Sequence, residues 1–261
     1  MKAKYMIIFA IIISLFTSTC NAKEAATLSS LDKIADQALQ LTKSGKYEDA
    51  KQMLEYFSDQ FTKVSFQDKM LSMDDLRVLT VSHNKALEAV TNLSMPDSER
   101  INDVMTFRLV MDALHSKYQP LWTEMERSIM TAFNQVQQAA EAGDQESYHY
   151  KLNSFLSQYS IIEPSLKVDI SPERLQKLDA KITYLDQYRN VSDNTDQINE
   201  LNLIHNDLQQ LFDQMNQDEA DPSIWWVIFS TGGIIIFTLS YVGWRKYKGQ
   251  RMEKQKKERN D

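Results

Sequence analysis

An uncharged stretch of 21 residues near the C-terminus, Ile224–Trp244, strongly limits what this chain can become. A helix of that length, at about 1.5 Å rise per residue, reaches roughly 32 Å and matches the roughly 30 Å hydrocarbon core of a bilayer. Inside lipid, a single span can satisfy its backbone hydrogen bonds only as a helix. Aromatic residues suited to the two headgroup levels stand near its ends: Trp225, Trp226, Tyr241, Trp244 and Tyr247. We therefore predict a transmembrane helix over 224–244.

A basic tail follows the span directly. Residues 245–261 hold eight Lys or Arg against three Asp or Glu, a net charge of +5. Because positive charge marks the cytoplasmic flank of a membrane helix, we expect the tail in the cytoplasm and the preceding residues outside it. Each basic group near an anionic surface contributes roughly 1 kcal/mol of attraction, so we expect the tail to bind anionic lipid.

The N-terminus has the layout of a secretory signal peptide, which we predict over residues 1–22. Two lysines precede the apolar run Met6–Phe16, and small and polar residues follow it up to Ala22. A run of 11 residues is too short to cross a bilayer. Two outcomes stay open, namely cleavage after Ala22 and lipid attachment at Cys20. Because Cys20 is the only cysteine, its loss with the signal would leave no disulfide or thiol chemistry.

The remaining residues, 23–221, form an acidic segment. It holds 33 of the 36 Asp and Glu but only 19 of the 29 Lys and Arg, a net charge of about −14. Such a surface repels phosphate backbones and anionic headgroups, so we expect no nucleic-acid binding. About 200 residues without a linker-like stretch can share one hydrophobic core. We therefore predict one domain outside the cytoplasm.

Apolar residues recur every three or four positions through this domain, which predicts an all-α bundle. Glycine occurs there only at Gly45 and Gly143, and each proline is expected to open or end a helix. Ser171-Pro172-Glu173 and Ser72-Met73-Asp74-Asp75 are typical helix starts. The predicted helices cover residues 28–44, 46–62, 72–93, 97–118, 120–142, 144–160, 172–190 and 194–218.

The two glycines are 98 residues apart, and the same offset pairs apolar positions of neighbouring helices. Leu54 pairs with Leu152, and Phe57 with Phe155. A similar offset of 97 relates the helix that begins near 97 to the last one. These pairs suggest an internal duplication of residues 28–118 in 120–218. The alternative is that two amphipathic helices can always be aligned by chance, and the sequence alone does not decide between them.

The sequence contains no pattern typical of catalysis. The four histidines, His83, His115, His149 and His205, lie one per helix without metal-ligand spacing, and no nucleophile motif or phosphate-binding loop occurs. We therefore assign no catalytic, cofactor-binding or metal-binding residue and predict no enzyme. His83 lies on an apolar face and is expected in the core. The aromatic residues at helical spacing are also expected there: Tyr47, Tyr56, Phe57, Phe61 and Phe66.

The segment 38–61, with Gly45-Lys46-Tyr47 at its centre, resembles the sporulation protein YpjB family of endospore-forming bacilli, as does the order of signal peptide, helical domain and Trp-bearing span. The resemblance implies a membrane-anchored protein linked to spore formation, and it supplies no catalytic motif. Our hypothesis is a non-enzymatic interaction or scaffold protein that binds another envelope protein. An enzyme or metal carrier with a site assembled from separated helices is the alternative.

Overall fold

The computed structural model describes residues 22–68, 71–116, 119–187, 189, 194–217 and 222–257. Within those ranges the regular elements are all helical and no strand occurs, which confirms the all-α prediction. The predicted signal peptide, with Cys20, lies outside the described residues except for Ala22. The elements are α2 (Ala22–Lys43), α3 (Tyr47–Asp68), α4 (Met73–Thr91), α5 (Asp97–His115), the 3-10 helix η1 (Leu121–Met125), α6 (Glu126–Glu141), α7 (Gln145–Asp169), α8 (Pro172–Gln187), α9 (Asn194–Gln217) and α10 (Pro222–Lys257).

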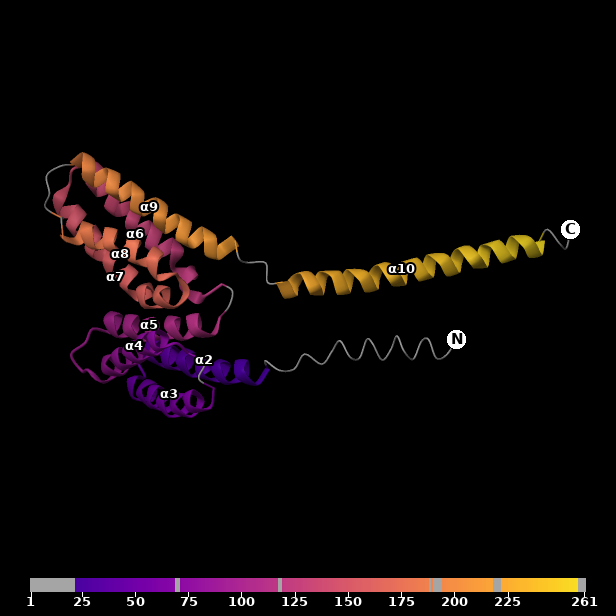
Figure 1. The fold of residues 1–261 in the computed structure, drawn as a ribbon, viewed down its shortest axis with the longest axis horizontal. Helices are drawn as coiled ribbons and strands as arrows, with labels where there is room; N and C mark the ends of the chain where they lie inside the picture. Colours follow the sequence, from indigo (N-terminus) through magenta and orange to yellow (C-terminus); the bar gives the residue numbers. More distant parts are fainter. Residues whose placement is uncertain are drawn as a thin grey trace. The chain divides into compact units, whose positions relative to one another are not determined.

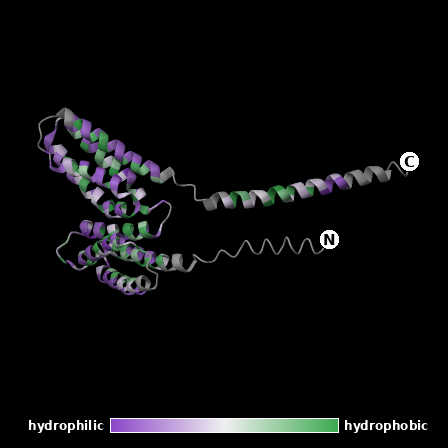
Figure 2. Cartoon of the chain, in the orientation of Figure 1, coloured by the Kyte–Doolittle hydropathy of each residue, from purple (hydrophilic) through white to green (hydrophobic). Residues whose placement is uncertain are grey.

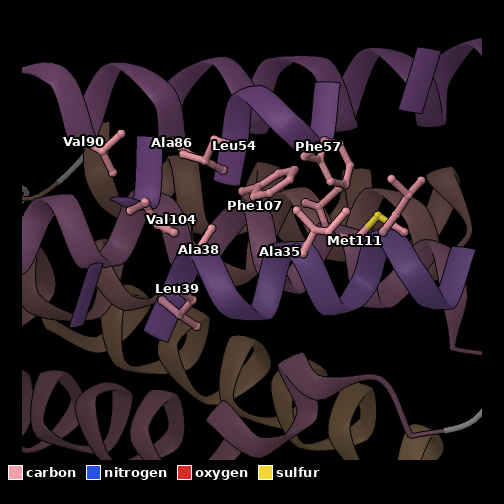
Figure 3. Packing of buried hydrophobic residues seen from close by; sticks show 14 of the residues in the cluster. Ala35, Ala38, Leu39, Leu54, Phe57, Ala86, Val90, Val104, Phe107 and Met111 are labelled. Atoms are coloured by element: carbon pink, nitrogen blue, oxygen red, sulfur yellow. The ribbon is translucent and has the colours of Figure 1, made fainter. Parts of the chain in front are cut away.

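The chain divides into two compact units, residues 1–214 and 215–261. In the first unit, α2 to α5 form a closed four-helix bundle, because α2 packs against both α3 and α5 while α4 packs against α3 and α5 (Figure 1). Figure 3 shows side chains of all four helices meeting in its core, among them Ala38, Leu54, Ala86 and Phe107. Each of these four side chains is fully buried.

Helices α6 to α9 carry a second core in the same unit. α6 packs against α7, and α7 packs against α8. The Phe133 ring of α6 lies 4.9 Å from the Phe155 ring of α7, edge to face, and 6.3 Å from the His205 ring of α9. Lys181 of α8 pairs with Asp207 of α9 at 2.6 Å. These contacts hold the four helices around one apolar interior.

The helix starts follow the expected capping chemistry. The Ser72 hydroxyl accepts a hydrogen bond from the Asp75 amide at 3.0 Å, and the Asp75 carboxylate accepts one from the Ser72 amide at 3.1 Å. This reciprocal pair is a capping box. α8 begins at Pro172, whose missing N–H would have no helical partner there in any case.

Four predicted segments differ clearly in the structure. α2 begins at Ala22 instead of residue 28, and α3 ends at Asp68 instead of residue 62. The helix expected to end at 160 continues to Asp169 with Pro164 inside it. The reason is packing: Ile161, Ile162 and Leu166 are buried on either side of the proline, and their burial offsets the one hydrogen bond that proline removes. The start of the predicted helix 120–142 is instead the 3-10 helix η1.

The two glycine turns share one backbone geometry. Gly45 has φ +71° and Gly143 has φ +67°, the left-handed conformation predicted for a glycine after a helix. The residue after each glycine donates to a carbonyl five positions earlier, at 2.9 Å after Gly45 and 3.1 Å after Gly143. The glycine amide donates three positions back in both turns, at 3.0 and 3.1 Å. Both helices therefore end in the same Schellman-type turn.

Burial follows the offset as well. Fully buried positions that are 98 residues apart include Leu31 and Ile129, Ala35 and Phe133, Ala38 and Val136, and Leu54 and Leu152. These matches favour the duplication of 28–118 in 120–218, which stays a prediction.

One helix face differs between the two bundles. Leu109 and Ala113 of α5 are buried, whereas Asn206 and Gln210, their counterparts on α9, are exposed. The reason is that α5 buries this face against α7 and η1 of the second bundle, whereas the corresponding face of α9 is exposed.

The second unit is dominated by α10, a single helix of 36 residues. Its segment Trp226–Lys248 is long and apolar enough to cross a membrane, and it is the one such segment in the described part of the chain. The segment is not buried in the structure. Figure 2 shows its apolar stretch changing to a hydrophilic one toward the C-terminus. The segment overlaps the predicted span 224–244 and, like it, is a long apolar helix.

Candidate functional site

A cleft of about 1120 Å³ opens in the first unit, between helices of the two bundles. One wall consists of α4 and α5, and the other consists of the C-terminal half of α7 with α8. Small and apolar side chains form its base, since Ser82, Thr106, Ile161 and Leu175 are all buried. A volume of this size suits a peptide segment or a small ligand.

The ionisable side chains that line this cleft differ in exposure. The half-buried ionisable side chains in its lining are all acidic: Asp103 on α5, Glu163 on α7 and Asp179 on α8. The cations Arg77 and Lys85 on α4 and Lys167 on α7 are exposed, as are two further acids, Asp74 and Glu99. Of these cations, Lys167 is paired with Glu163 at 2.7 Å. The half-buried ionisable groups of the cleft, which we call its inner carboxylates, are therefore all hydrogen-bond acceptors when charged.

Two of the inner carboxylates lack an ion pair. No described cation lies within 4.0 Å of Asp103 or Asp179. Burial raises the pKa of Asp103, and the more distant charge of Lys85 only partly opposes it. Burial also raises the pKa of Asp179, although that carboxylate accepts a 2.7 Å hydrogen bond from the Tyr159 hydroxyl, which acts in the opposite direction. Both carboxylates are therefore desolvated without full compensation.

A backbone acceptor adds to this arrangement. Pro164 has no N–H, so the carbonyl of Ser160, four residues earlier in α7, has no donor from that position. Ser160 and Pro164 both line the cleft.

A buried polar relay lies at the junction of the two bundles. The Arg108 guanidinium donates to Asp32 at 2.7 and 3.3 Å and lies 3.7 Å from Asp112. Asp112 accepts a 2.7 Å bond from the amide of Leu121, which opens η1. Burial raises the pKa of Asp32, while Arg108 opposes that rise. The relay joins α2 and α5 of the first bundle to η1.

Trp122, the next residue of η1, links η1 to α7. The indole of Trp122 is fully buried and donates to the Asp169 carboxylate at 2.6 Å. Burial raises the pKa of Asp169 to about 6, the Trp122 hydrogen bond opposes that rise, and the nearby charges of Asp112 and Asp75 add to it. This carboxylate titrates close to neutral pH, and it stabilises the fold more in its protonated form.

The four histidines considered in the sequence do not line the cleft. His83 is buried in the first core, where its Nε2 atom bonds the Leu54 carbonyl oxygen at 2.9 Å and its ring lies 5.5 Å from that of Phe57. His115, His149 and His205 lie on α5, α7 and α9 and do not line the cleft. Among the described residues, no three His, Cys, Asp or Glu side chains form a group that could hold a metal ion.

The aromatic residues divide between core and surface. Phe57 is buried and Phe61 stacks on it at 5.9 Å, as expected. Tyr47 is half-buried and packs against Arg100, whose guanidinium carbon lies 4.2 Å from the ring centre. Tyr56 is 49% exposed, so its assignment to the core was wrong. The side chain of Phe66 lies outside those that the structure describes.

The sequence reasoning missed the inner carboxylates. Both stand at the edge of an apolar stripe: Asp103 lies four positions before the buried Phe107, and Asp179 four positions after the buried Leu175. An acid at the edge of a core-facing stripe was the available signal. It does not reveal the cleft, because that depends on how the two bundles meet.

The sequence matches the family described as "Sporulation protein YpjB (SpoYpjB)" over residues 28–257. The chain belongs to the sporulation protein YpjB family. It is 33% identical to the YpjB protein of Bacillus subtilis (strain 168) over 262 residues, which covers 99% of both chains. No solved structure matches the chain. Membership in the YpjB family confirms the resemblance seen in segment 38–61 and links the chain to sporulation.

Proposed function

We propose that this YpjB family member is a single-pass membrane protein whose helical domain lies outside the cytoplasm and acts in spore formation by binding another envelope protein. The proposal rests chiefly on α10, whose apolar segment Trp226–Lys248 is exposed in a chain whose other helices bury their apolar stripes. The basic residues after this segment favour a cytoplasmic tail. A signal peptide over 1–22 would direct the helical domain to the opposite side.

Binding accounts for the cleft better than catalysis does. A catalytic pair needs a nucleophile or base held beside its partner group. The cleft lining has no histidine and no cysteine, and its unpaired inner carboxylates are Asp103 and Asp179. An enzyme or metal carrier would need a single indispensable side chain among them. A binding surface draws most of its binding free energy from a few residues and needs no reactive group.

Topology is tested by labelling two engineered cysteines in a Cys20→Ser chain. Ser58→Cys marks the helical domain, and Gln250→Cys marks the tail. An impermeant thiol reagent applied to intact cells without their wall should label position 58 and leave position 250 unlabelled. Permeabilised cells provide the control, because both positions should then react. Labelling of position 250 alone in intact cells would reverse the proposed orientation.

Function is tested in sporulating cells that carry altered α10 segments. Replacing 226–248 with an unrelated apolar span of the same length should preserve spore yield, because the span acts only as an anchor. Removing residues 222–261 should reduce spore yield to that of the deletion strain while the helical domain is still exported. Normal spore yield from the anchorless domain would contradict the proposed role of the membrane. Loss of sporulation in a stably folded single histidine variant, such as His115→Gln, would favour an enzyme instead, because His115 lies outside the cleft.

A further inference from the structure

The cleft between the bundles differs from an ordinary polar surface in how its charges are placed. The half-buried ionisable side chains in its walls are all acidic, whereas its cations are exposed, as are the two further acids Asp74 and Glu99. Asp103 projects from the first bundle and Asp179 from the second, so any guest between the walls meets carboxylates from both. Neither has an ion-pair partner among the described residues. The cleft thus has unsatisfied capacity for positive charge.

We propose that this cleft binds a basic segment of a partner protein, with Lys or Arg side chains placed between Asp103 on α5 and Asp179 on α8. The inference rests on the proposed binding function and specifies its partner. Lys and Arg side chains are rich in N–H donors, which suit the two carboxylates. Their aliphatic stems would cover the apolar base at Ile161 and Leu175.

Other guests fit this cleft less well. An anion would meet the inner carboxylates, and the rim cation Lys167 already pairs with Glu163. A metal ion would need several ligands in one group, which the described residues do not supply. The chain's own basic tail, 245–261, is separated from the cleft by the bilayer in the proposed topology. A basic segment of another protein on the same side of the membrane is the occupant that matches the chemistry.

The test uses the full chain in nanodiscs of neutral lipid and a labelled 16-residue peptide of alternating Lys and Ala, with anisotropy measured in 0.15 M salt. Asp103→Asn/Asp179→Asn should weaken peptide binding about tenfold. The control, Asp59→Asn/Asp213→Asn, removes the same charge from exposed positions outside the cleft. It should weaken binding less than twofold. The doubly substituted chain should fold normally, because the amide oxygen introduced by Asp179→Asn can still accept from the Tyr159 hydroxyl.

A second variant blocks the cleft without altering an inner carboxylate. Val81 is 51% exposed at the rim, so Val81→Arg should fold normally and lower peptide affinity by repulsion and bulk. Leu203→Arg, at a 49% exposed position on α9, is its control and should bind as the native chain does. Circular dichroism and the thermal midpoint verify folding in all four variants.

Three results would overturn the proposal. Equal weakening by the cleft pair and the control pair would show general attraction to an acidic surface. Equal binding of a Glu-Ala peptide would exclude recognition of positive charge. Tighter peptide binding after removal of residues 249–261 would identify the chain's own tail as the occupant. Each result leaves the membrane-anchor test unaffected, so failure of the basic-segment proposal and failure of the proposed function are distinguishable.

Discussion

Asp169→Asn should make the protein more stable at neutral pH. Burial is the main cause of the raised pKa of Asp169, about 6 against an ordinary value of 3.8. The carboxylate is therefore held in its charged form at a cost when the pH exceeds 6. A difference of about 2 pKa units, at about 1.4 kcal/mol per unit, sets this cost at about 3 kcal/mol. Asn removes the charge and can still accept the Trp122 N–H bond through its side-chain oxygen.

The sign of the pH dependence follows from the same shift. The folded state binds the Asp169 proton more tightly than the unfolded state, so this group's stabilising contribution is fully present below pH 3.8 and is lost as pH rises through 6. The advantage of Asp169→Asn should accordingly be largest at about pH 7 to 8, up to about 3 kcal/mol, and should disappear near about pH 4.

Urea unfolding followed by circular dichroism at pH 4, 5, 6, 7 and 8, with the full chain in a mild non-ionic detergent, measures the difference between variant and native chain. Titration of the other acids cancels in that difference to first order. Asp59→Asn, at an exposed position on α3, is the control and should change the free energy of unfolding by less than about 0.5 kcal/mol at each pH. A difference for Asp169→Asn that is flat with pH, or that favours the native chain at pH 8, would refute the reasoning.

Gly45→Ala and Gly143→Ala should each lower the free energy of unfolding by about 1 kcal/mol, because a Cβ disfavours positive φ although space around both glycines is open; clearly unequal losses in urea unfolding would count against equivalent turns. Trp122→Phe should cost about 3 kcal/mol by removing a buried indole and its bond to Asp169. At pH 7, Trp122→Phe should lower the free energy of unfolding less in an Asp169→Asn background than in the native chain, because the bond that it removes no longer reaches a charged acceptor. Equal losses in the two backgrounds would show that the two residues are uncoupled. A synthetic 245–261 peptide should sediment with anionic vesicles and be released by high salt; equal binding to neutral vesicles would exclude an electrostatic tail.

Local signals in the sequence were sufficient for most helices and their ends. Ser72 and Asp75 stand three positions apart and cap α4 through bonds within one turn. Gly45 and Gly143 take positive φ because the end of a helix needs that conformation and glycine adopts it without strain. The span near 224–244 depends only on length and the absence of charge. Each of these features involves residues close in sequence, so no knowledge of distant partners was needed.

Features that depend on distant partners could not be inferred in this way. Pro164 stays inside α7 because side chains from other helices bury both neighbouring turns, although local chemistry alone favours a break. The pKa of Asp169 is about 6 because packing removes the carboxylate from water, and the hydrogen bond from Trp122, 47 positions away, only partly offsets that rise. The cleft exists because the bundles meet through α5 and α7, which places Asp103 and Asp179 on facing walls. The sequence by itself determined the helices, their caps and the apolar span, since backbone geometry and hydropathy act locally; only the tertiary structure decided which charges lost their water, because burial is a property of the packed chain.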